Sequence, residues 1–503
     1  DPVVAIHIGV RREPCVGIED VPVAGYSVDV KAALRAGRDD AKVQVQAKRF
    51  TTAAVTPGAV RVVPVSKAAA ALITASGSAA PQLVADAAIT GTSASTKGYA
   101  TYACQPPSAS QWLVGGASIP GRTAVLTIAN VDDAPATVNV EVWTDQGKSG
   151  ARSLDGIEVP AHSRAQLPLA LVEPGRAVYA VHVIATSGQV SSSIVDRGQS
   201  GLASLGVDAV APSNEPGTQQ FVGIIPDGAT DARIAFVSPG IPTTVRVSLL
   251  TQDGEFALAG AEAVAVDADK LNVVDIPNDA MIGDVAVIVR ADDPVVAGAT
   301  FSVSIRGGKD LASAPSLTPI YRAASFTVDG TVSKATLLLR SDRDTSVSVV
   351  SGFGRAQQRN VVELKADRIE RVTLVAGSGS SRLFAIEPLL DGVVTGAVLL
   401  QRASVGMVAT SVQPLISIRG FVAVPPVAPA LANALAKAST GCTIRCTSMG
   451  ARDPSGRTAW ASGGVISAPT TFPMAGGTTG LAGERGPEAI LPLTRGPDDV
   501  GSA

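Results

Sequence analysis

The sequence is poor in the residue types on which most catalytic and metal sites depend. Its 503 residues include only 3 His and 4 Cys, and aromatic residues make up 4% of the chain. An acid–base or metal centre would therefore have to rely on scattered carboxylates. We expect no catalytic residues, no metal ligands and no cofactor, and hence a protein that is not an enzyme.

The sequence also lacks an excess of either charge. Its 41 Lys and Arg residues nearly balance 44 Asp and Glu residues, which leaves a formal net charge of −3. These charges are spread evenly, so they create no strong field to attract nucleic acid or an anionic membrane. We expect no nucleic-acid partner.

Long apolar runs are missing too. Charge, proline or turn residues interrupt every stretch long enough to cross a bilayer, so we expect no membrane span within the chain. The first residue is Asp1, and no basic segment followed by an apolar one resembles a signal peptide. We therefore expect the numbering to begin inside a longer precursor. A membrane anchor upstream of Asp1 is compatible with this expectation.

What the sequence has in abundance is the chemistry of strands and turns. It contains 50 Gly and 33 Pro, and its Val and Thr residues suit a pleated, half-buried surface. Alternating β-branched residues before a hairpin glycine recur three times, about a hundred residues apart. The three sets are Val138, Val140 and Val142 before Gly147; Val245, Val247 and Leu249 before Gly254; and Val347 and Val349 before Gly354. The sequence thus predicts an all-β protein of tandem Ig-like β-sandwich modules, with a largely irregular C-terminal tail.

Composition and turn residues suggest the domain boundaries. Residues 1–109 are predicted to form an N-terminal β-rich region, in which the periodicity of 1–54 is weak. Within this region we predict a short helix at 27–37 and strands at 59–65 and 82–90. Three sandwich modules are predicted at 110–200, 217–303 and 318–415. Residues 420–503 are a Pro/Gly/Ala-rich tail in which 428–438 is a candidate short helix.

The four cysteines are candidates for disulfide bonds. If the protein is exported, a bond between Cys15 and Cys104 would close a long loop and restrict the unfolded chain; two independent thiols remain an equal alternative. Cys442 and Cys446 are spaced one residue too far apart for a redox Cys-x-x-Cys pair, and no second pair completes a zinc site. We interpret them as linker cysteines that can bridge to each other.

The few other candidates for chemistry have simpler structural interpretations. His182 alternates with Val181 and Val183, which predicts a solvated face for its side chain, and His162 follows a turn and is expected to face solvent. Trp112 and Trp143 are expected to fill the core of the first sandwich rather than to stack on a ligand. The remaining candidates are acidic pairs without a calcium-loop pattern and Gly-Gly pairs without a phosphate-loop pattern, all expected in turns: Asp132-Asp133, Asp292-Asp293, Asp498-Asp499, Gly115-Gly116 and Gly476-Gly477.

Residues 55–415 resemble a known family. The segments are Tyr102-Ala-Cys104-Gln-Pro-Pro-Ser-Ala-Ser-Gln-Trp112-Leu-Val-Gly-Gly116, Leu126-Thr-Ile-Ala-Asn130 and Val142-Trp143-Thr-Asp-Gln-Gly147. They are similar to a domain-of-unknown-function family of actinobacterial exported proteins with Ig-like strands. The family's Cys-Pro-Gly-Pro stretch is absent around Cys15, which Pro14 precedes. No activity is known for that family, so the resemblance implies an extracellular or cell-surface location and little else.

The tail resembles a different family. Gly463-Gly-Val-Ile-Ser-Ala-Pro-Thr-Thr-Phe-Pro-Met474 and Gly480-Leu-Ala-Gly-Glu-Arg-Gly-Pro-Glu-Ala-Ile-Leu-Pro-Leu-Thr494 are similar to the end of phage tail tape-measure proteins. We therefore favour a non-enzymatic extracytoplasmic structural or adhesive protein, a row of modules whose surface or protein partner is unknown. The alternatives are a phage tail component and a chimeric sequence that joins the two.

Overall fold

In the computed structural model the chain divides into two compact units, Asp1–Val424 and Pro425–Ala503. The structure describes residues 97–415 except 306–307, 353–356, 376–378 and 405–406. Outside that range it describes strands only. In the first unit these are β1 (Val10–Cys15), β2 (Tyr26–Leu34), β3 (Gln44–Gln46), β4 (Val60–Pro64), β5 (Ala71–Ser76) and β6 (Leu83–Gly91).

The described residues form an all-β protein, which confirms the predicted fold class. Their only helices are three single 3₁₀ turns, Arg152–Leu154, Leu169–Leu171 and Asn278–Ala280. No helix in the described part of the chain is long and apolar enough to cross a membrane. The predicted helix at 27–37 is wrong, because β2 lies between β4 and β6. Its residues from Val30 to Leu34 are buried on both faces, which hides the two-residue period of a strand.

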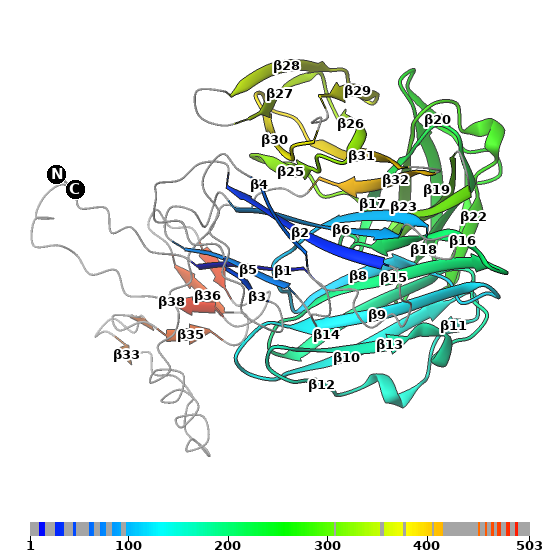
Figure 1. The fold of residues 1–503 in the computed structure, drawn as a ribbon. Helices are drawn as coiled ribbons and strands as arrows, with labels where there is room; N and C mark the ends of the chain where they lie inside the picture. The colour runs from blue at the N-terminus through cyan, green and yellow to red at the C-terminus, as the bar shows by residue number, and fades with distance from the viewer. Residues whose placement is uncertain are drawn as a thin grey trace, which may run out of the picture. The chain divides into compact units, whose positions relative to one another are not determined.

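The first unit contains four modules with matching strands (Figure 1). The N-terminal module consists of β1 to β6 and β7 (Gly98–Ala103). Module 1 contains β8 (Ser110–Gly115), β9 (Arg122–Asn130), β10 (Ala136–Thr144), β11 (Gly147–Lys148), β12 (Ile157–Val159), β13 (Ser163–Pro168), β14 (Tyr179–Ser187), β15 (Ser191–Ser200) and β16 (Ala203–Val210).

Modules 2 and 3 repeat this plan. Module 2 contains β17 (Gly217–Ile225), β18 (Ala229–Val237), β19 (Thr243–Leu250), β20 (Glu255–Ala257), β21 (Val264–Val266), β22 (Leu271–Asp275), β23 (Val285–Ile305) and β24 (Gly308–Pro315). Module 3 contains β25 (Ala324–Val328), β26 (Val332–Ser341), β27 (Thr345–Ser351), β28 (Gln358–Leu364), β29 (Ile369–Leu374), β30 (Arg382–Pro388), β31 (Val394–Ser404) and β32 (Met407–Pro414).

Each module has two sheets of fixed strand order. We call one the hub sheet, with the orders β4-β2-β6-β7, β13-β9-β15-β16, β22-β18-β23-β24 and β29-β26-β31-β32. The other, the second sheet, begins with the module's first strand, as in β8-β14-β10 and β25-β30-β27-β28. In the immunoglobulin order the first strand pairs with the second. Here β8 pairs with β14, and β9 pairs with β15 instead, so the modules are antiparallel sandwiches with a strand order of their own.

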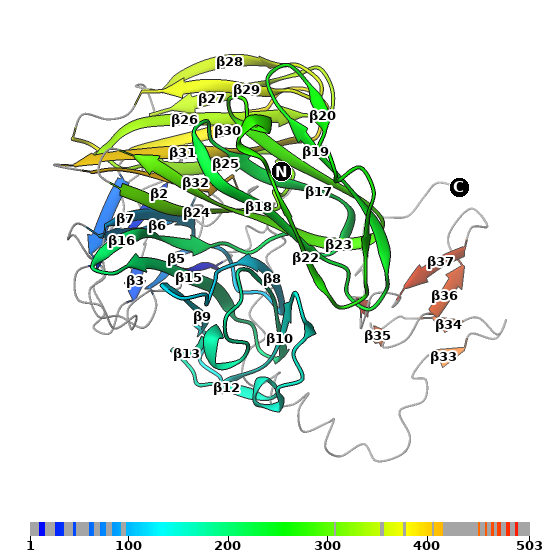
Figure 2. The ribbon, with the colours of Figure 1, turned by 90° about the vertical axis from the view of Figure 1, so that its right-hand side faces the viewer.

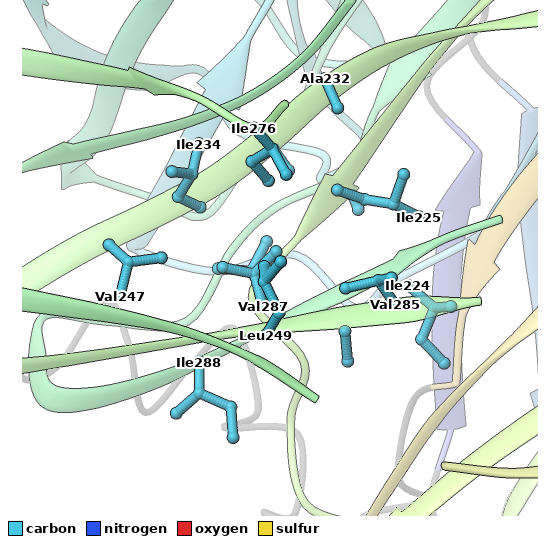
Figure 3. Close-up of a cluster of buried hydrophobic side chains, with 14 of the residues drawn as sticks. Ile224, Ile225, Ala232, Ile234, Val247, Leu249, Ile276, Val285, Val287 and Ile288 are labelled. Carbon is cyan, nitrogen blue, oxygen red and sulfur yellow. The ribbon is translucent and has the colours of Figure 1, made fainter. Parts of the chain in front are cut away.

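The core of module 2 shows how one strand can serve both sheets. β23 pairs with β17 and β19 through its first half and with β18 and β24 through its second half. Val285 and Val287 from the first half of β23 share a buried cluster with Ile234 of β18 and with Val247 of the neighbouring strand β19 (Figure 3). Two strands separated by a turn at Asp292-Asp293 were expected. Instead both acids lie within β23, where the strand passes between the sheets.

The last strand of each hub sheet lies at a common centre. We call β7, β16, β24 and β32 the hub strands; β7 contacts β16, β16 contacts β24, β24 contacts β32, and β32 contacts β7. Figure 2 shows these strands at the inner edges of their sheets. The strands approach closely, because a Cβ atom on Gly206 would lie 2.3 Å from Asp310 Oδ1 and 2.4 Å from the Leu311 nitrogen. The four modules therefore form a closed ring that resembles the radial plan of a β-propeller.

Buried polar side chains connect the hub strands. Asp310 on β24 accepts hydrogen bonds from the Tyr99 nitrogen at 3.1 Å and the Val207 nitrogen at 3.2 Å. Thr101 on β7 donates its backbone N–H to Ser411 Oγ at 2.8 Å. These bonds join residues more than a hundred positions apart, so they fix the modules' mutual positions.

Apolar side chains fill each junction between neighbouring modules. Those of module 1 include Trp112 and Trp143, packed against Ala235 and Val296 of module 2. Those of module 3 include Leu338 and Leu399, which belong to the core cluster of module 2. The last junction closes the ring, because Ala88 and Tyr99 of the N-terminal module join the core of module 3. The expected row of modules is therefore wrong, since the first and fourth modules are in contact.

Module 3 differs from modules 1 and 2 at one edge. In modules 1 and 2 the strand corresponding to β27 pairs with two short pieces, β11 and β12 or β20 and β21. In module 3, β27 pairs along its whole length with one continuous strand, β28. Among the described residues no strand pairs with the outer edge of β28, which lies at the periphery in both views (Figures 1 and 2).

The second unit is described only as three short antiparallel strand pairs. They are β33 (Ala451–Arg452) with β34 (Thr458–Ala459), β35 (Gly464–Ile466) with β38 (Glu488–Ile490), and β36 (Thr470–Pro473) with β37 (Thr479–Ala482). The last two pairs fall within 463–494, the segment that resembles tape-measure proteins. The candidate helix at 428–438 lies outside the described residues.

Candidate functional site

Three polar side chains of module 1 form a chain of hydrogen bonds. Ser110 Oγ lies 2.9 Å from His182 Nε2, and His182 Nδ1 lies 3.3 Å from Glu141 Oε2. Strand pairing explains the arrangement, because β8, β14 and β10 are neighbours and His182 is opposite both Trp112 and Glu141 in register. A hydroxyl, an imidazole and a carboxylate in this order are the elements of a nucleophile activated by a base.

Aromatic rings support the imidazole from one side. The His182 ring stacks on Trp112 with centroids 4.0 Å apart, and Trp112 stacks on Trp143 at 5.0 Å. The Trp143 indole donates its Nε1–H to Asp269 Oδ1 of module 2 at 3.0 Å. The imidazole therefore lies at the rim of the junction between modules 1 and 2, in a fixed orientation.

The protonation of His182 decides what this group can do. Burial lowers the pKa of His182, while the hydrogen bond and negative charge of Glu141 oppose the shift. Ser110 Oγ also lies 2.8 Å from Glu215 Oε1, to which it can donate. A neutral imidazole with its proton on Nδ1 leaves Nε2 free to accept the Ser110 proton; a protonated imidazole donates to both Glu141 and Ser110 and directs the hydroxyl toward Glu215.

The sequence placed His182 on the correct side of its strand but predicted the wrong surroundings. Val181 and Val183 point into the module core, and His182 points away from it, as alternation requires. However, its side chain is only 15% exposed, because the Trp112 ring stacks on it and Ser110 and Glu141 flank it. Trp112 and Trp143 are buried as expected, although they fill the junction with module 2 and not the core of one sandwich. His162 is exposed, which confirms its prediction.

Buried carboxylates at the hub are a second candidate. Burial raises the pKa of Asp208 to about 7, with a contribution from the negative charge of Asp196 and an opposing hydrogen bond from Ser313. Burial also raises the pKa of Asp310 well above its usual range, against three backbone hydrogen bonds. Among the described residues no His, Cys, Asp or Glu cluster could hold a metal ion. Asp310 accepts hydrogen bonds from β7 and β16, and Asp208 accepts one from Ser313 of β24, so we assign these aspartates to the structure of the hub.

A small pocket lies where β7 and β8 meet β15 and β16. Its volume is about 20 Å³, and its lining includes Tyr102, Gln111, Ser191 and Ser193. The two serine hydroxyls are buried without a hydrogen-bond partner in the described structure. This volume suits a water molecule and is far below the roughly 300 Å³ that a small organic ligand requires.

The candidate cysteines are only partly described. Cys104 is buried and disulfide-bonded. The side chains of Cys15, Cys442 and Cys446 lie outside the described residues, so the pairing of Cys104 with Cys15 stays a prediction. Asp132 and Asp133 lie in a turn after β9, as expected, and Asp133 pairs with His162. Gly476-Gly477 and Asp498-Asp499 lie outside the described residues.

No sequence motif marks the Ser110–His182–Glu141 group, because strand register brings its members together from positions 41 and 72 residues apart. The hub strands also went unpredicted, although a proline recurs at or just after each one, at Pro106, Pro212, Pro315 and Pro414. The recurring proline was the sequence signal from which the hub strands could have been predicted.

The fold and these sites define a ring of four antiparallel β-sandwich modules. A family model described as a family of unknown function (DUF5719) matches residues 59–374, so the chain belongs to that family. The match runs from β4 through β29 and thus includes parts of all four modules. No curated protein matches the chain.

Proposed function

We propose that the protein is a non-enzymatic, extracytoplasmic structural or adhesive scaffold, built to hold exposed loops and strand edges in fixed positions. The closed ring carries this proposal. Four sandwiches joined through buried junctions and a hydrogen-bonded hub present their outer surfaces in one rigid arrangement. Such a scaffold suits binding to a cell-surface or protein partner.

The disulfide of Cys104 supports the proposed extracytoplasmic location. Disulfide bonds persist in oxidising compartments and are rare where thiols are kept reduced. Cell fractionation, with a membrane-impermeant amine label applied to intact cells, tests the location. Recovery in the labelled surface or medium fraction, with Cys104 of the denatured protein resistant to maleimide until reduction, supports the proposal. Recovery only in the cytoplasm, with Cys104 of the denatured protein reactive before reduction, contradicts it.

A phage tail component remains the alternative for the C-terminal segment 463–494. The same fractionation separates the two proposals, because recovery only in purified virions would favour the tail component. Sequencing the gene across codons 415–465 tests for a chimera, since a frame or assembly break there would detach the segment from the ring.

A second candidate function is serine-dependent ester hydrolysis, which the Ser110–His182–Glu141 geometry favours. In this reaction Ser110 Oγ bonds to the ester carbonyl carbon and its proton passes to His182 Nε2. The departing alcohol takes that proton, and water then releases the acid and restores Ser110. A fluorophosphonate probe would label the wild type but neither Ser110→Ala nor His182→Ala. Equal labelling of the wild type and Ser110→Ala, or no labelling of any variant, would contradict this candidate.

A further inference from the structure

The outer edge of β28 has the features of a strand-pairing surface. Along the described chain it is unpaired, continuous over seven residues and largely exposed; the Val361 side chain is 57% exposed. An edge strand offers a row of free backbone N–H and C=O groups, which natural proteins commonly shorten or interrupt to prevent association. Modules 1 and 2 have such interruptions at this position, and module 3 does not.

The residues of β28 are complementary to themselves. In an antiparallel pair of identical strands centred on Val361, Val361 faces its own copy, and Arg359 faces Glu363 of the other strand in both directions. These three residues share one face of β28, because side chains alternate along a strand. Arg359 and Glu363 are both exposed. Opposite charges thus meet on both sides of a valine contact.

The other face of β28 also tolerates this register. Asn360 would face Val362 of the second copy, and Gln358 would face Leu364, so no like charges meet there. The flanking Lys365 would lie opposite Gln357 and keep its own ion pair with Asp344. Arg359 keeps its contacts with Ser348 of β27 and Glu387 of β30, the strands on the paired side of β28. Every charged group of the strand therefore retains or gains an opposite partner.

We propose that two copies of this protein associate through β28, forming a two-fold symmetric dimer in which the second sheets of both module 3 copies become one continuous sheet. The contact is isologous, as most dimer contacts are. It is short, so the dimer is weak and forms with increasing protein concentration. On a surface that displays many copies, weak contacts of this kind add through multivalency.

Charge reversal tests the predicted register. In Glu363→Arg, each Arg359 faces another arginine, and in Arg359→Glu, each Glu363 faces another glutamate. Each single variant should dimerise at least about tenfold more weakly than the wild type, because two attractive pairs become repulsive. Sedimentation velocity from about 1 µM to about 1 mM covers the range of weak association. Glu370→Arg is the matched control, an identical charge change at an exposed position of β29.

Mixing the two variants distinguishes register from loss of folding. An equimolar mixture of Glu363→Arg and Arg359→Glu should form a mixed dimer in which every facing pair is opposite in charge, and the double variant should regain wild-type association. Melting curves confirm that each variant is folded. A wild type that stays monomeric to about 1 mM, single variants that associate like the wild type, or a mixture that does not associate would each overturn the proposal.

Discussion

Ionisation of Asp208 lowers the free energy of unfolding. Its folded-state pKa, raised to about 7 by burial, exceeds the usual 3.8, so the folded protein binds a proton there more tightly than the unfolded chain does. The favourable contribution of protonated Asp208 to folding stability is fully present below about pH 3.8 and is lost as the pH rises through about 7. This one group should therefore make the ring less stable at pH 8 than at pH 5.

We predict that Asp208→Asn stabilises the protein at pH 8 by up to roughly 4 kcal/mol and has little effect near pH 4. An asparagine keeps an oxygen to accept from Ser313 and cannot ionise. Urea denaturation of both proteins from pH 4 to pH 8 measures the difference. Parallel stability curves over that range would show that Asp208 does not titrate as described.

Trp143 is predicted to stabilise the junction between modules 1 and 2. Trp143→Phe removes the hydrogen bond to Asp269 and part of the stack on Trp112, so we expect a loss of roughly 1–3 kcal/mol in the free energy of unfolding. Phe256→Leu, at an aromatic residue that is 54% exposed, is the control and should be nearly neutral. Similar losses in both variants, measured by urea denaturation, would contradict the assigned role.

At the scale of elements, the hub strands depend on close backbone approach. Gly206 has a φ of 110°, and a Cβ there would lie within 2.4 Å of Asp310 and Leu311 atoms. Gly206→Ala should therefore destabilise the protein by roughly 2–4 kcal/mol, because both the backbone and β24 would have to move.

Gly228→Ala is the matched control for this prediction. Gly228 also has a positive φ, 77°, but no atom lies within 4 Å of its added Cβ. Gly228→Ala should therefore reduce the stability of the protein only by the smaller free-energy cost of an unfavourable φ. Equal shifts of the two melting temperatures would mean that the hub is not closely packed at Gly206.

A strand could be predicted from the sequence when one of its faces is buried and the other is more exposed, because the residue types then alternate along the strand. β10 and β19 have one face in a core and one face less buried, so their alternation was visible, and the turns at Gly147 and Gly254 were found. β2 and the hub strands are covered on both faces and use small or polar residues, so no such period appears. The Ser110–His182–Glu141 group was invisible because pairing register, not local sequence, assembles it.

At the scale of the molecule, the ring predicts cooperative unfolding. Independent modules on a string would melt in separate steps, whereas these modules share core clusters and hub hydrogen bonds. We expect one calorimetric transition for residues 1–415, with a van't Hoff enthalpy close to the calorimetric one. Three or four resolved transitions, each with the enthalpy of about a hundred residues, would contradict the closed ring.

The junction that closes the ring also sets the order in which the protein can mature. Asp86 accepts hydrogen bonds from Thr327 and from Gln413 Nε2, the latter at 2.7 Å, so its last partner is made 327 residues after it. At ordinary rates of translation this interval lasts roughly 15 to 65 s. During that time Asp86 lacks these partners, and Ala88 and Tyr99 of the N-terminal module lack the core of module 3 that later covers them. We therefore expect the N-terminal module to reach its final packing only after module 3 has been made.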